Sequence, residues 1–432
     1  MRVQPPDPAP REYPPAVHLL RRSARGSAAA PGVTTVDDII AWLLGDAIGD
    51  NDLLTLFESL VWRLVAAGLP LDRASLHVGT LHPQMIGLTW NWELADAICD
   101  EVRVGEASLG TDAYRRNPLF RVIEHGETVR AMTDDADTVA RYPLVAALAA
   151  QGYTEYTASP LGGGTVFHNA ATVATRQVGG FTPAQRADLN RILKVFGLHV
   201  ERHVIQRIAG NVLDTYLGAA AGARVLGGSI RRGSGEPIHA VVWASDLRGF
   251  TDLADRLDGP DMIALLNAYF ERMAGAVIDH GGEVLKFIGD GLLAVFPFGA
   301  FAVETAAAEA SLAAAKQAIA YLDVLNADEG GPLSGIEGWR PLRTGIALHE
   351  GEVFFGNVGA PERLDFTVIG RAVNVAARVE ALTKVLGRPI LVTAPVAARL
   401  ARPLESFGAH DLRGVAEQVE IFAPAPGDAD RR

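Results

Sequence analysis

Two spacings of hydrophobic residues alternate along the chain, and together they predict a protein of mixed helices and strands. Apolar side chains three and four residues apart, as in residues 52–68, indicate helices that bury one face. Apolar residues that alternate with polar ones, as in residues 73–83, indicate paired strands. Between residues 36 and 217 the predicted order is helix, strand pair, short helix, strands and one long final helix.

The long final helix is predicted to begin at Thr182 and Pro183, because threonine caps helix N-termini and proline fits the first helical turn. Its apolar positions recur at helical spacing: Leu189, Leu193, Phe196, Val200, Val204, Ile208 and Val212. A stripe of this length suits either a parallel helical stalk between two chains or a terminal helix packed on its own domain. Both interpretations stay open at this point.

From Pro237 onward the predicted order is strand, helix, hairpin, helix, strand pair, helix and two closing strands. The first part of this order predicts an α+β fold, a ferredoxin-like sandwich in which an antiparallel sheet carries helices on one face. The Gly-, Ala- and Arg-rich segment 218–236 is the predicted connector. The expected organisation is a disordered leader (residues 1–35), a first domain (36–217), this connector (218–236), a second domain (237–424) and a tail (425–432).

Composition narrows the class of protein further. The chain has 432 residues, 49% hydrophobic and 21% charged, as expected for globular domains. A formal net charge of −12 without a basic stripe argues against a nucleic-acid surface. Cys99, the single cysteine, fits a reducing cytoplasm, and no uncharged apolar run reaches the roughly 18 residues of a membrane span.

Two aspartates carry the candidate chemistry. Asp246 ends the apolar strand that opens the second domain, and Asp290 lies at the tip of the hairpin in KFIGDGLLAVFP. The Asp-Gly pair by itself predicts only a tight turn. In a strand–helix–hairpin unit, however, the first strand and the hairpin are neighbours, so the two carboxylates are predicted to converge, repel each other and attract Mg²⁺ or Mn²⁺. The helix that begins just after Asp246 would point free N–H groups at a phosphate.

Three segments resemble the catalytic domain of class III adenylyl and guanylyl cyclases: WASDLRGFTDLADRL, GGEVLKFIGDGLLAVF and DFTVIGRAVNVAARVE. The resemblance covers about residues 237–424. It implies that Asp246, Leu247 and Asp290 bind two Mg²⁺ ions, for which Mn²⁺ can substitute. The substrate-binding segment that it implies comprises Leu247, Arg248, Gly249, Phe250 and Thr251. The reaction implied is attack of the ribose 3′-hydroxyl on the α-phosphorus, giving a 3′,5′-cyclic nucleotide and pyrophosphate.

The same resemblance assigns four further residues. Asn374 and Arg378, four residues apart on the third helix, match the family's transition-state pair. Lys286 and Thr367 match the positions that choose the purine, and Lys with Thr resembles the bacterial adenylyl type, so ATP is expected. Asp365 is the alternative polar partner if the register is shifted by two. The family's triphosphate-binding lysine has no clear match here, and Arg413 is the nearest basic residue.

In this family the metal aspartates and the Asn/Arg pair of one site come from two catalytic domains, which implies a head-to-tail homodimer. The element order of residues 36–217 resembles a GAF-type sensory domain, without a motif that identifies its signal, which can be a small molecule or a protein. The expected protein is a cytoplasmic adenylyl cyclase with an N-terminal regulatory domain. The alternatives are a guanylyl cyclase of the same fold and a catalytically silent nucleotide-binding regulator.

Overall fold

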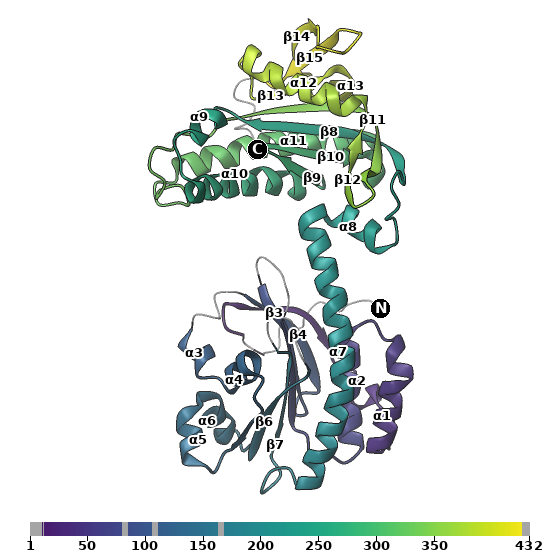
Figure 1. The fold of residues 1–432 in the computed structure, drawn as a ribbon, viewed down its shortest axis with the longest axis vertical. Helices are drawn as coiled ribbons and strands as arrows, with labels where there is room; N and C mark the ends of the chain where they lie inside the picture. The colour runs from purple at the N-terminus through teal and green to yellow at the C-terminus, as the bar shows by residue number, and fades with distance from the viewer. Residues whose placement is uncertain (1–10, 12, 80–84, 106–110, 163–167, 426–432) are drawn as a thin grey trace. The chain divides into compact units, whose positions relative to one another are not determined.

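The computed structural model of the chain describes residues 11, 13–79, 85–105, 111–162 and 168–425 (Figure 1). These residues fall into two compact units, Met1–Val212 and Leu213–Arg432. Both units combine helices with a sheet, as the alternating spacings predict. Among the described residues, no helix is both long enough and apolar enough to cross a membrane.

The first unit is built on a seven-stranded antiparallel sheet in the order β1-β4-β3-β2-β7-β6-β5. The strands are β1 (Val17–Ser23), β2 (Arg73–Gly79), β3 (Met85–Glu93), β4 (Ile98–Gly105), β5 (Val129–Met132), β6 (Glu155–Pro160) and β7 (Ala170–Thr175). The helices are α1 (Val36–Leu44), α2 (Leu53–Ala66), α3 (Asp112–Arg115), α4 (Pro118–His125), α5 (Ala136–Arg141), α6 (Pro143–Ala150) and α7 (Pro183–Leu217), with short 3₁₀ turns at Gly26–Ala29 and Asp46–Gly49.

Helices cover both faces of this sheet (Figure 1). Val173 of β7 packs in one core with residues of α1, α2 and α7, whereas Ala174, which points to the other face, packs with residues of α4 and α6. Neighbouring residues of one strand thus serve two separate cores. Strand β7, whose residues are all buried, therefore contacts helices on both sides.

The prediction of a disordered leader over residues 1–35 is wrong for its described part. β1 pairs with β4, and Arg22 of β1 lies 2.6 Å from the buried carboxylate of Asp100. Just after the strand, Arg25 lies 2.6 Å from Glu58, which is also buried. These arginines supply the partners that buried carboxylates require. The ion pairs with Asp100 and Glu58 thus order a segment whose composition suggests disorder.

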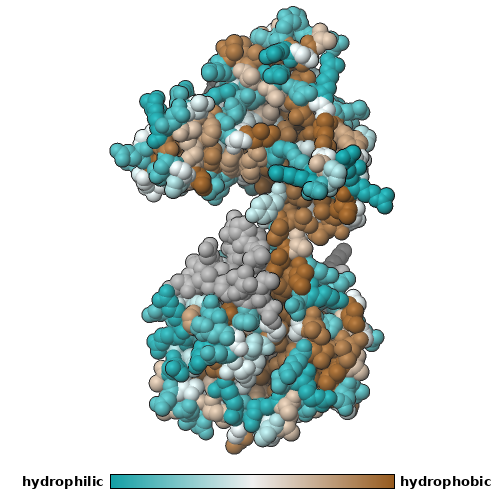
Figure 2. Space-filling view, in the orientation of Figure 1, coloured by the Kyte–Doolittle hydropathy of each residue, from teal (hydrophilic) through white to brown (hydrophobic). Residues whose placement is uncertain are grey.

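Helix α7 packs on its own unit over its first half. Leu189, Phe196 and Val200 are buried in the core with α1 and α2. This part of the apolar stripe is therefore ordinary domain packing. Other apolar residues of α7 are exposed, with Leu198 63% and Ile205 60% accessible, and Figure 2 shows hydrophobic surface along the exposed part of the helix.

The second unit carries an eight-stranded sheet in the order β14-β15-β13-β11-β8-β10-β9, with β12 paired to β11. All pairs are antiparallel except β11 with β13. The strands are β8 (Gly235–Leu247), β9 (Glu283–Ile288), β10 (Gly291–Pro297), β11 (Thr344–Ala360), β12 (Arg363–Ile369), β13 (Ile390–Thr393), β14 (Glu405–His410) and β15 (Val419–Ala423). The helices are α8 (Ala219–Leu226), α9 (Phe250–Ala254), α10 (Gly259–Asp279), α11 (Glu304–Ala327), α12 (Arg371–Leu386) and α13 (Ala394–Ala397), with a 3₁₀ turn at Phe298–Ala300.

The ferredoxin-like core is confirmed: β8, α10, β9, β10, α11 and β11 follow in sequence and give the sheet order β11-β8-β10-β9. Trp243 of β8 packs with α10 and α11, whereas Val242 packs on the opposite face, with α12. The expectation of helices on one face is therefore wrong for the complete domain, because α12 covers the second face.

Part of the predicted connector is also packed structure. Residues 219–226 form α8, and Ala221 is fully buried in the core that α12 closes. Strand β8 begins at Gly235, inside the segment 218–236. The Gly- and Ala-rich composition that predicts a linker here serves close packing instead.

Candidate active site

The hairpin between β9 and β10 brings Asp290 beside Asp246. The two residues between the paired strands are Gly289 and Asp290, rather than Asp290 and Gly291, and Gly289 has a φ of +62° that glycine adopts without strain. Gly291 lies opposite Asp246 in the register of β10 with β8. A Cβ atom on Gly291 would lie 2.8 Å from the carbonyl oxygen of Ser245, so glycine permits this close pairing. The predicted convergence of the two carboxylates is present.

The pKa of Asp290 is raised above its ordinary value, first by burial and then by the negative charge of Asp246. Two adjacent carboxylates whose negative charges repel are a good site for a divalent cation. Mg²⁺ usually keeps several waters and binds one or two carboxylates together with substrate phosphates. The residues present therefore fit the metal that the sequence predicts.

Arg248 places a positive charge beside this pair. Its Nη1 lies 4.0 Å from Asp246 Oδ2, and its Nη2 donates to Glu380 Oε1 of α12 at 2.7 Å and also to the hydroxyl of Thr383. A Cβ atom on Gly345 of β11 would overlap the Arg248 guanidinium, so this glycine makes the space that the side chain occupies. Sequence reasoning missed Glu380, which lies 132 positions from its partner.

The charges of the two aspartates also affect the pKa of Glu380. Burial raises its pKa, Arg248 lowers it, and the charges of Asp246 and Asp290 raise it further. Three carboxylates and one guanidinium thus share one electrostatic environment. Negative charge is in excess there, which favours a cation.

A cavity of about 850 Å³ opens beside the aspartates. The predicted substrate-binding segment lines it: Leu247, Arg248, Gly249, Phe250 and Thr251. Gly249 has a φ of +74° and leads directly into α9. Three basic residues that sequence reasoning missed line the same cavity: Arg343, Lys384 and Arg388. Their separation along the chain gives no local signal, because only the fold brings the end of α12 next to β11.

Lys286 and Thr367 lie elsewhere on the unit. Lys286 of β9 forms an ion pair with Asp365 of β12, the alternative residue of the shifted register. Thr367, two positions along β12, is buried, and its hydroxyl has no hydrogen-bond partner among the described residues. Neither Lys286 nor Thr367 is among the described residues that line the cavity of Asp246 and Asp290.

Asn374 and Arg378 are exposed on the first half of α12, and they too are absent from the described lining of that cavity. Arg413 is exposed between β14 and β15 and lies outside it as well. A single chain therefore divides the predicted residues into two groups: Asp246, Asp290 and residues 247–251 at the cavity, and Lys286, Thr367, Asn374 and Arg378 away from it.

Comparison with known proteins finds relatives for the second unit of the chain. Residues 238–422 match the family model described as the adenylate and guanylate cyclase catalytic domain. The adenylate cyclase of Anabaena cylindrica is 35% identical over 193 residues, which cover 45% of this chain and 36% of that protein. Adenylate cyclase 1 of Rhizobium meliloti strain 1021 is 30% identical over 183 residues, 41% of this chain and 26% of that protein. The chain thus spans about a third or less of the length of these two relatives.

Among solved structures, a bacterial light-regulated adenylyl cyclase is 26% identical, with 56% of this chain and 66% of that chain covered and a TM-score of 0.44. The family match spans β8 to β15 and includes every predicted catalytic, metal-binding and substrate-binding residue. Residues 238–422 of the chain are thus similar to the catalytic domain of adenylate and guanylate cyclases.

Proposed function

We propose that the protein is a Mg²⁺-dependent adenylyl cyclase that converts ATP to 3′,5′-cyclic AMP and pyrophosphate at sites shared by two copies of the chain. The observation that carries this proposal is the adjacency of Asp246 and Asp290 in the lining of a cavity of about 850 Å³, where burial and the charge of Asp246 raise the pKa of Asp290. The relatives of this segment from Anabaena cylindrica and Rhizobium meliloti are named adenylate cyclases, which supports ATP as the substrate.

Asp246 and Asp290, with Leu247, would hold two Mg²⁺ ions, which would supply Lewis-acid activation of the ribose 3′-hydroxyl and charge neutralisation at the phosphates. Phe250 and Thr251 present backbone N–H groups in the first turn of α9, where they suit the β- and γ-phosphates, whereas the N–H of Arg248 donates to the carbonyl oxygen of Arg343. Arg343, Lys384 and Arg388 add positive charge to the same cavity. Arg248 is held by Glu380 and limits the repulsion between the carboxylates.

The second group of residues supports a shared site. Arg378 offers a planar fork for the α-phosphate and Asn374 an amide for the ribose. Both are exposed on α12, away from the cavity of their own chain. We infer that they complete the site of a second copy, so that a homodimer has two equivalent sites.

Base choice rests on Lys286 and Thr367. A lysine donates to adenine N1, and a threonine hydroxyl accepts from the 6-amino group. The hydroxyl of Thr367 is buried and has no hydrogen-bond partner among the described residues, which supports this role. Lys286 forms an ion pair with Asp365. We therefore infer that Asp365 orients the lysine for its contact with adenine. We infer a cytoplasmic location from the intracellular substrate and from the single cysteine, and a regulatory role for the N-terminal unit.

The direct test incubates purified protein with Mn²⁺ or Mg²⁺ and either ATP or GTP, and measures cyclic product by chromatography. We expect cyclic AMP from ATP and little product from GTP. Asp290→Ala should lower the rate at least about a thousandfold, because it removes a metal-binding carboxylate at a partly buried turn, and the fold should persist. Glu337→Ala, which removes an exposed carboxylate of the same unit, is the matched control and should leave the rate unchanged.

Three results would count against the proposal. Cyclic GMP as the main product would favour the guanylyl cyclase. Nucleotide binding without either product would favour the silent regulator. Full activity in a folded Asp290→Ala protein would remove the metal assignment.

A further inference from the structure

A chain of buried, hydrogen-bonded polar side chains ends at the backbone of Asp246. Thr344 of β11 is 4% exposed, and its hydroxyl donates to the carbonyl oxygen of Asp246 at 3.0 Å. Tyr269 of α10 is fully buried, and its phenol oxygen lies 2.9 Å from the Thr344 hydroxyl. Side chains from α10 and β11 thus hold a residue near the end of β8.

The direction of these hydrogen bonds follows from the hydrogens that the two side chains carry. The Thr344 hydroxyl faces two carbonyl oxygens, that of Asp246 and, at 3.4 Å, that of Gly345. Carbonyl oxygens only accept, so the single hydroxyl hydrogen of Thr344 points to them and Tyr269 donates to Thr344. Burial raises the pKa of Tyr269 above its ordinary value, so the phenol keeps its hydrogen at neutral pH.

The chain of hydrogen bonds begins on β8 itself. Nε1 of Trp243 donates to Oγ of Ser245 at 3.1 Å, and Ser245 has a side-chain hydrogen bond with Tyr269. The indole N–H is only a donor, so the Ser245 hydrogen is left for the phenol oxygen. The hydrogens then point one way along the chain: from Trp243 through Ser245, Tyr269 and Thr344 to Asp246. Hydrogen bonds in such a series strengthen one another in a core of low dielectric constant.

Packing alone does not require these polar groups. Trp243 and Tyr269 lie in the apolar core that α10 and α11 form with the sheet. Replacing both partners of a buried hydrogen bond by apolar groups of the same shape is often nearly neutral for stability. The polar groups add a directed contact, and that contact is made to a candidate metal ligand.

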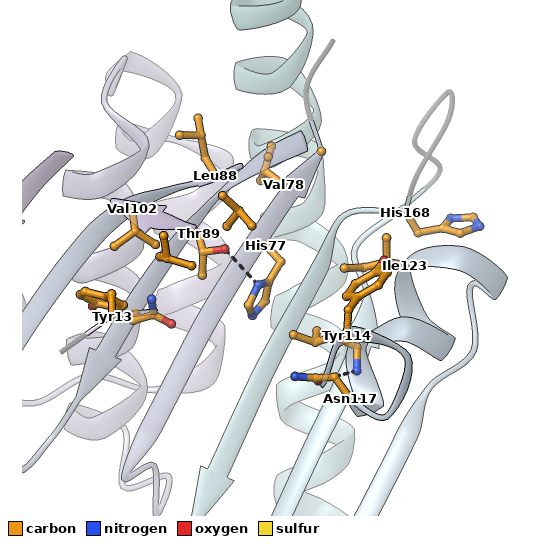
Figure 3. Close-up of a pocket in the computed structure, with 16 residues that line it drawn as sticks. Tyr13, His77, Val78, Leu88, Thr89, Val102, Tyr114, Asn117, Ile123 and His168 are labelled. Atoms are coloured by element: carbon orange, nitrogen blue, oxygen red, sulfur yellow. Dashed lines mark hydrogen bonds between the residues drawn. The ribbon is translucent and has the colours of Figure 1, made fainter. Parts of the chain in front are cut away.

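The first unit offers a comparison. There Nδ1 of His77 lies 3.1 Å from the hydroxyl of Thr89, and both residues line a cavity, as Figure 3 shows. A hydrogen-bonded polar pair inside a unit is therefore no sign of catalysis by itself. The chain through Tyr269 and Thr344 differs by its end point, the backbone of Asp246.

We propose that Thr344 and Tyr269 are positioning residues of the metal site, which hold the backbone of Asp246 so that its carboxylate stays beside that of Asp290. This inference rests on the metal site of the proposed function. Strand β8 ends at Leu247, directly after Asp246, so the strand itself restrains the aspartate from one side only. Mg²⁺ demands near-ideal geometry, and groups that orient metal ligands typically change metal affinity by about 10- to 100-fold.

The experiment titrates the full chain with Mn²⁺ in the absence of nucleotide and follows the electron paramagnetic resonance signal of the free ion. Thr344→Val keeps the shape of the side chain and removes its hydroxyl, so Mn²⁺ should bind about tenfold more weakly. Tyr269→Phe removes the donor to Thr344 and should weaken binding about threefold. Thr344→Ser keeps the hydroxyl and should bind Mn²⁺ as the unmodified protein does.

Cyclase assays provide a second measurement. At low Mn²⁺ concentration, Thr344→Val should be slower than the unmodified protein by about the same tenfold factor, and the rate should recover when Mn²⁺ is saturating. A general loss of folded protein would lower the rate at both concentrations.

Thr393→Val is the matched control. Thr393 is also buried in the second unit, where its hydroxyl lies 2.9 Å from Nδ1 of His349, and it is absent from the described lining of the cavity of the aspartates. This variant loses a buried hydrogen bond of the same kind, so its stability should fall while its affinity for Mn²⁺ stays unchanged. Tyr321→Phe removes a phenol from α11 and should also leave this affinity unchanged.

Asp290→Ala distinguishes this inference from the proposed function, because it removes a metal ligand and should lower the affinity most. If Asp290→Ala binds Mn²⁺ normally, the metal site is wrong and the inference is overturned with it. If Asp290→Ala loses the ion while folded Thr344→Val and Tyr269→Phe bind it normally, the metal site stands and the positioning role is overturned. Equal losses of affinity in Thr344→Val and Thr393→Val would also overturn that role. Circular dichroism verifies each fold, and Tyr269→Phe tests the chain even if Thr344→Val fails to fold.

Discussion

At the scale of single residues, the most consequential contact is the one between Asp246 and Asp290. The raised pKa of Asp290 means that folding is favoured when this carboxyl is protonated. That stability is fully present below the ordinary aspartate pKa of 3.8 and is lost as pH rises through the higher folded value. At neutral pH without metal, the folded chain therefore carries a cost that a bound cation removes.

We expect Asp290→Asn to raise the melting temperature in a chelating buffer at neutral pH, because the substitution removes one of two repelling charges. Mg²⁺ should stabilise the unmodified protein, by about 2.7 kcal/mol when its concentration is a hundredfold above its Kd, and should not stabilise the variant. Differential scanning calorimetry with and without Mg²⁺ measures both effects. A lower melting temperature for the metal-free variant would contradict the repulsion.

His77 supports a prediction of the opposite sign. Its folded pKa of about 3 lies below the ordinary value of 6.5, so the unfolded chain binds a proton that the folded chain does not. Stability is therefore present above pH 6.5 and is lost as pH falls, by at most about 1.4 kcal/mol per pH unit. Urea unfolding of the first unit at several pH values in this window measures the slope, and His77→Gln should flatten it. An unchanged slope in the variant would assign the acid sensitivity to other groups.

At the scale of elements, α7 presents two different apolar faces. Leu189, Phe196 and Val200 are buried in the first unit, whereas Leu198 and Ile205, seven residues apart, are exposed. A seven-residue repeat of exposed apolar residues is typical of a helix that pairs with another helix. The predicted stalk therefore remains an open hypothesis, but it would use the exposed face rather than the stripe identified from the sequence.

We expect Ile205→Asp to weaken self-association, because it places a charge in the exposed apolar line of α7. Sedimentation equilibrium should show at least about a tenfold higher dimer dissociation constant, since burying an unpaired charge is costly. Gln206→Asp changes a neighbouring exposed position of the same helix and should leave the constant unchanged. Equal effects of the two variants would exclude a stalk at this face.

The sequence predicts elements where periodicity is local and fails where partners are remote. The hairpin of Asp290 is predictable because two apolar runs flank a glycine turn. Strand β1 is not predicted, because the sequence around it is rich in Pro, Ala and Arg. Arg22 and Arg25 are ordered by Asp100 and Glu58, which lie far along the chain. Glu380 likewise becomes part of the site only through Arg248.

At the scale of the whole molecule, the main feature is the division of predicted catalytic residues between two places on one chain. Asp246 and Asp290 line the cavity, and Asn374 and Arg378 are exposed on α12 outside its described lining. A monomer with this arrangement has two incomplete half-sites. Activity should then depend on protein concentration through dimerisation.

Mixing two inactive variants tests this arrangement. Asp246→Ala and Arg378→Ala should each be inactive alone, because each breaks both sites of a homodimer. A heterodimer of the two would retain one intact site, so about a quarter of the unmodified rate is expected when equal amounts associate at random. Differently tagged chains purified as heterodimers allow the measurement. No recovered activity in such heterodimers would contradict the shared site.

The space above Gly345, which the Arg248 guanidinium and the Thr383 hydroxyl occupy, restricts the side chains that position 345 can carry. Any larger side chain at that position displaces the Arg248 guanidinium from Glu380 and Thr383. The Thr383 hydroxyl would overlap the same Cβ atom, so replacement of Arg248 alone does not make room for a side chain at position 345. Chains that keep Arg248 in this position are therefore expected to keep glycine at position 345, although the two residues lie far apart in the sequence.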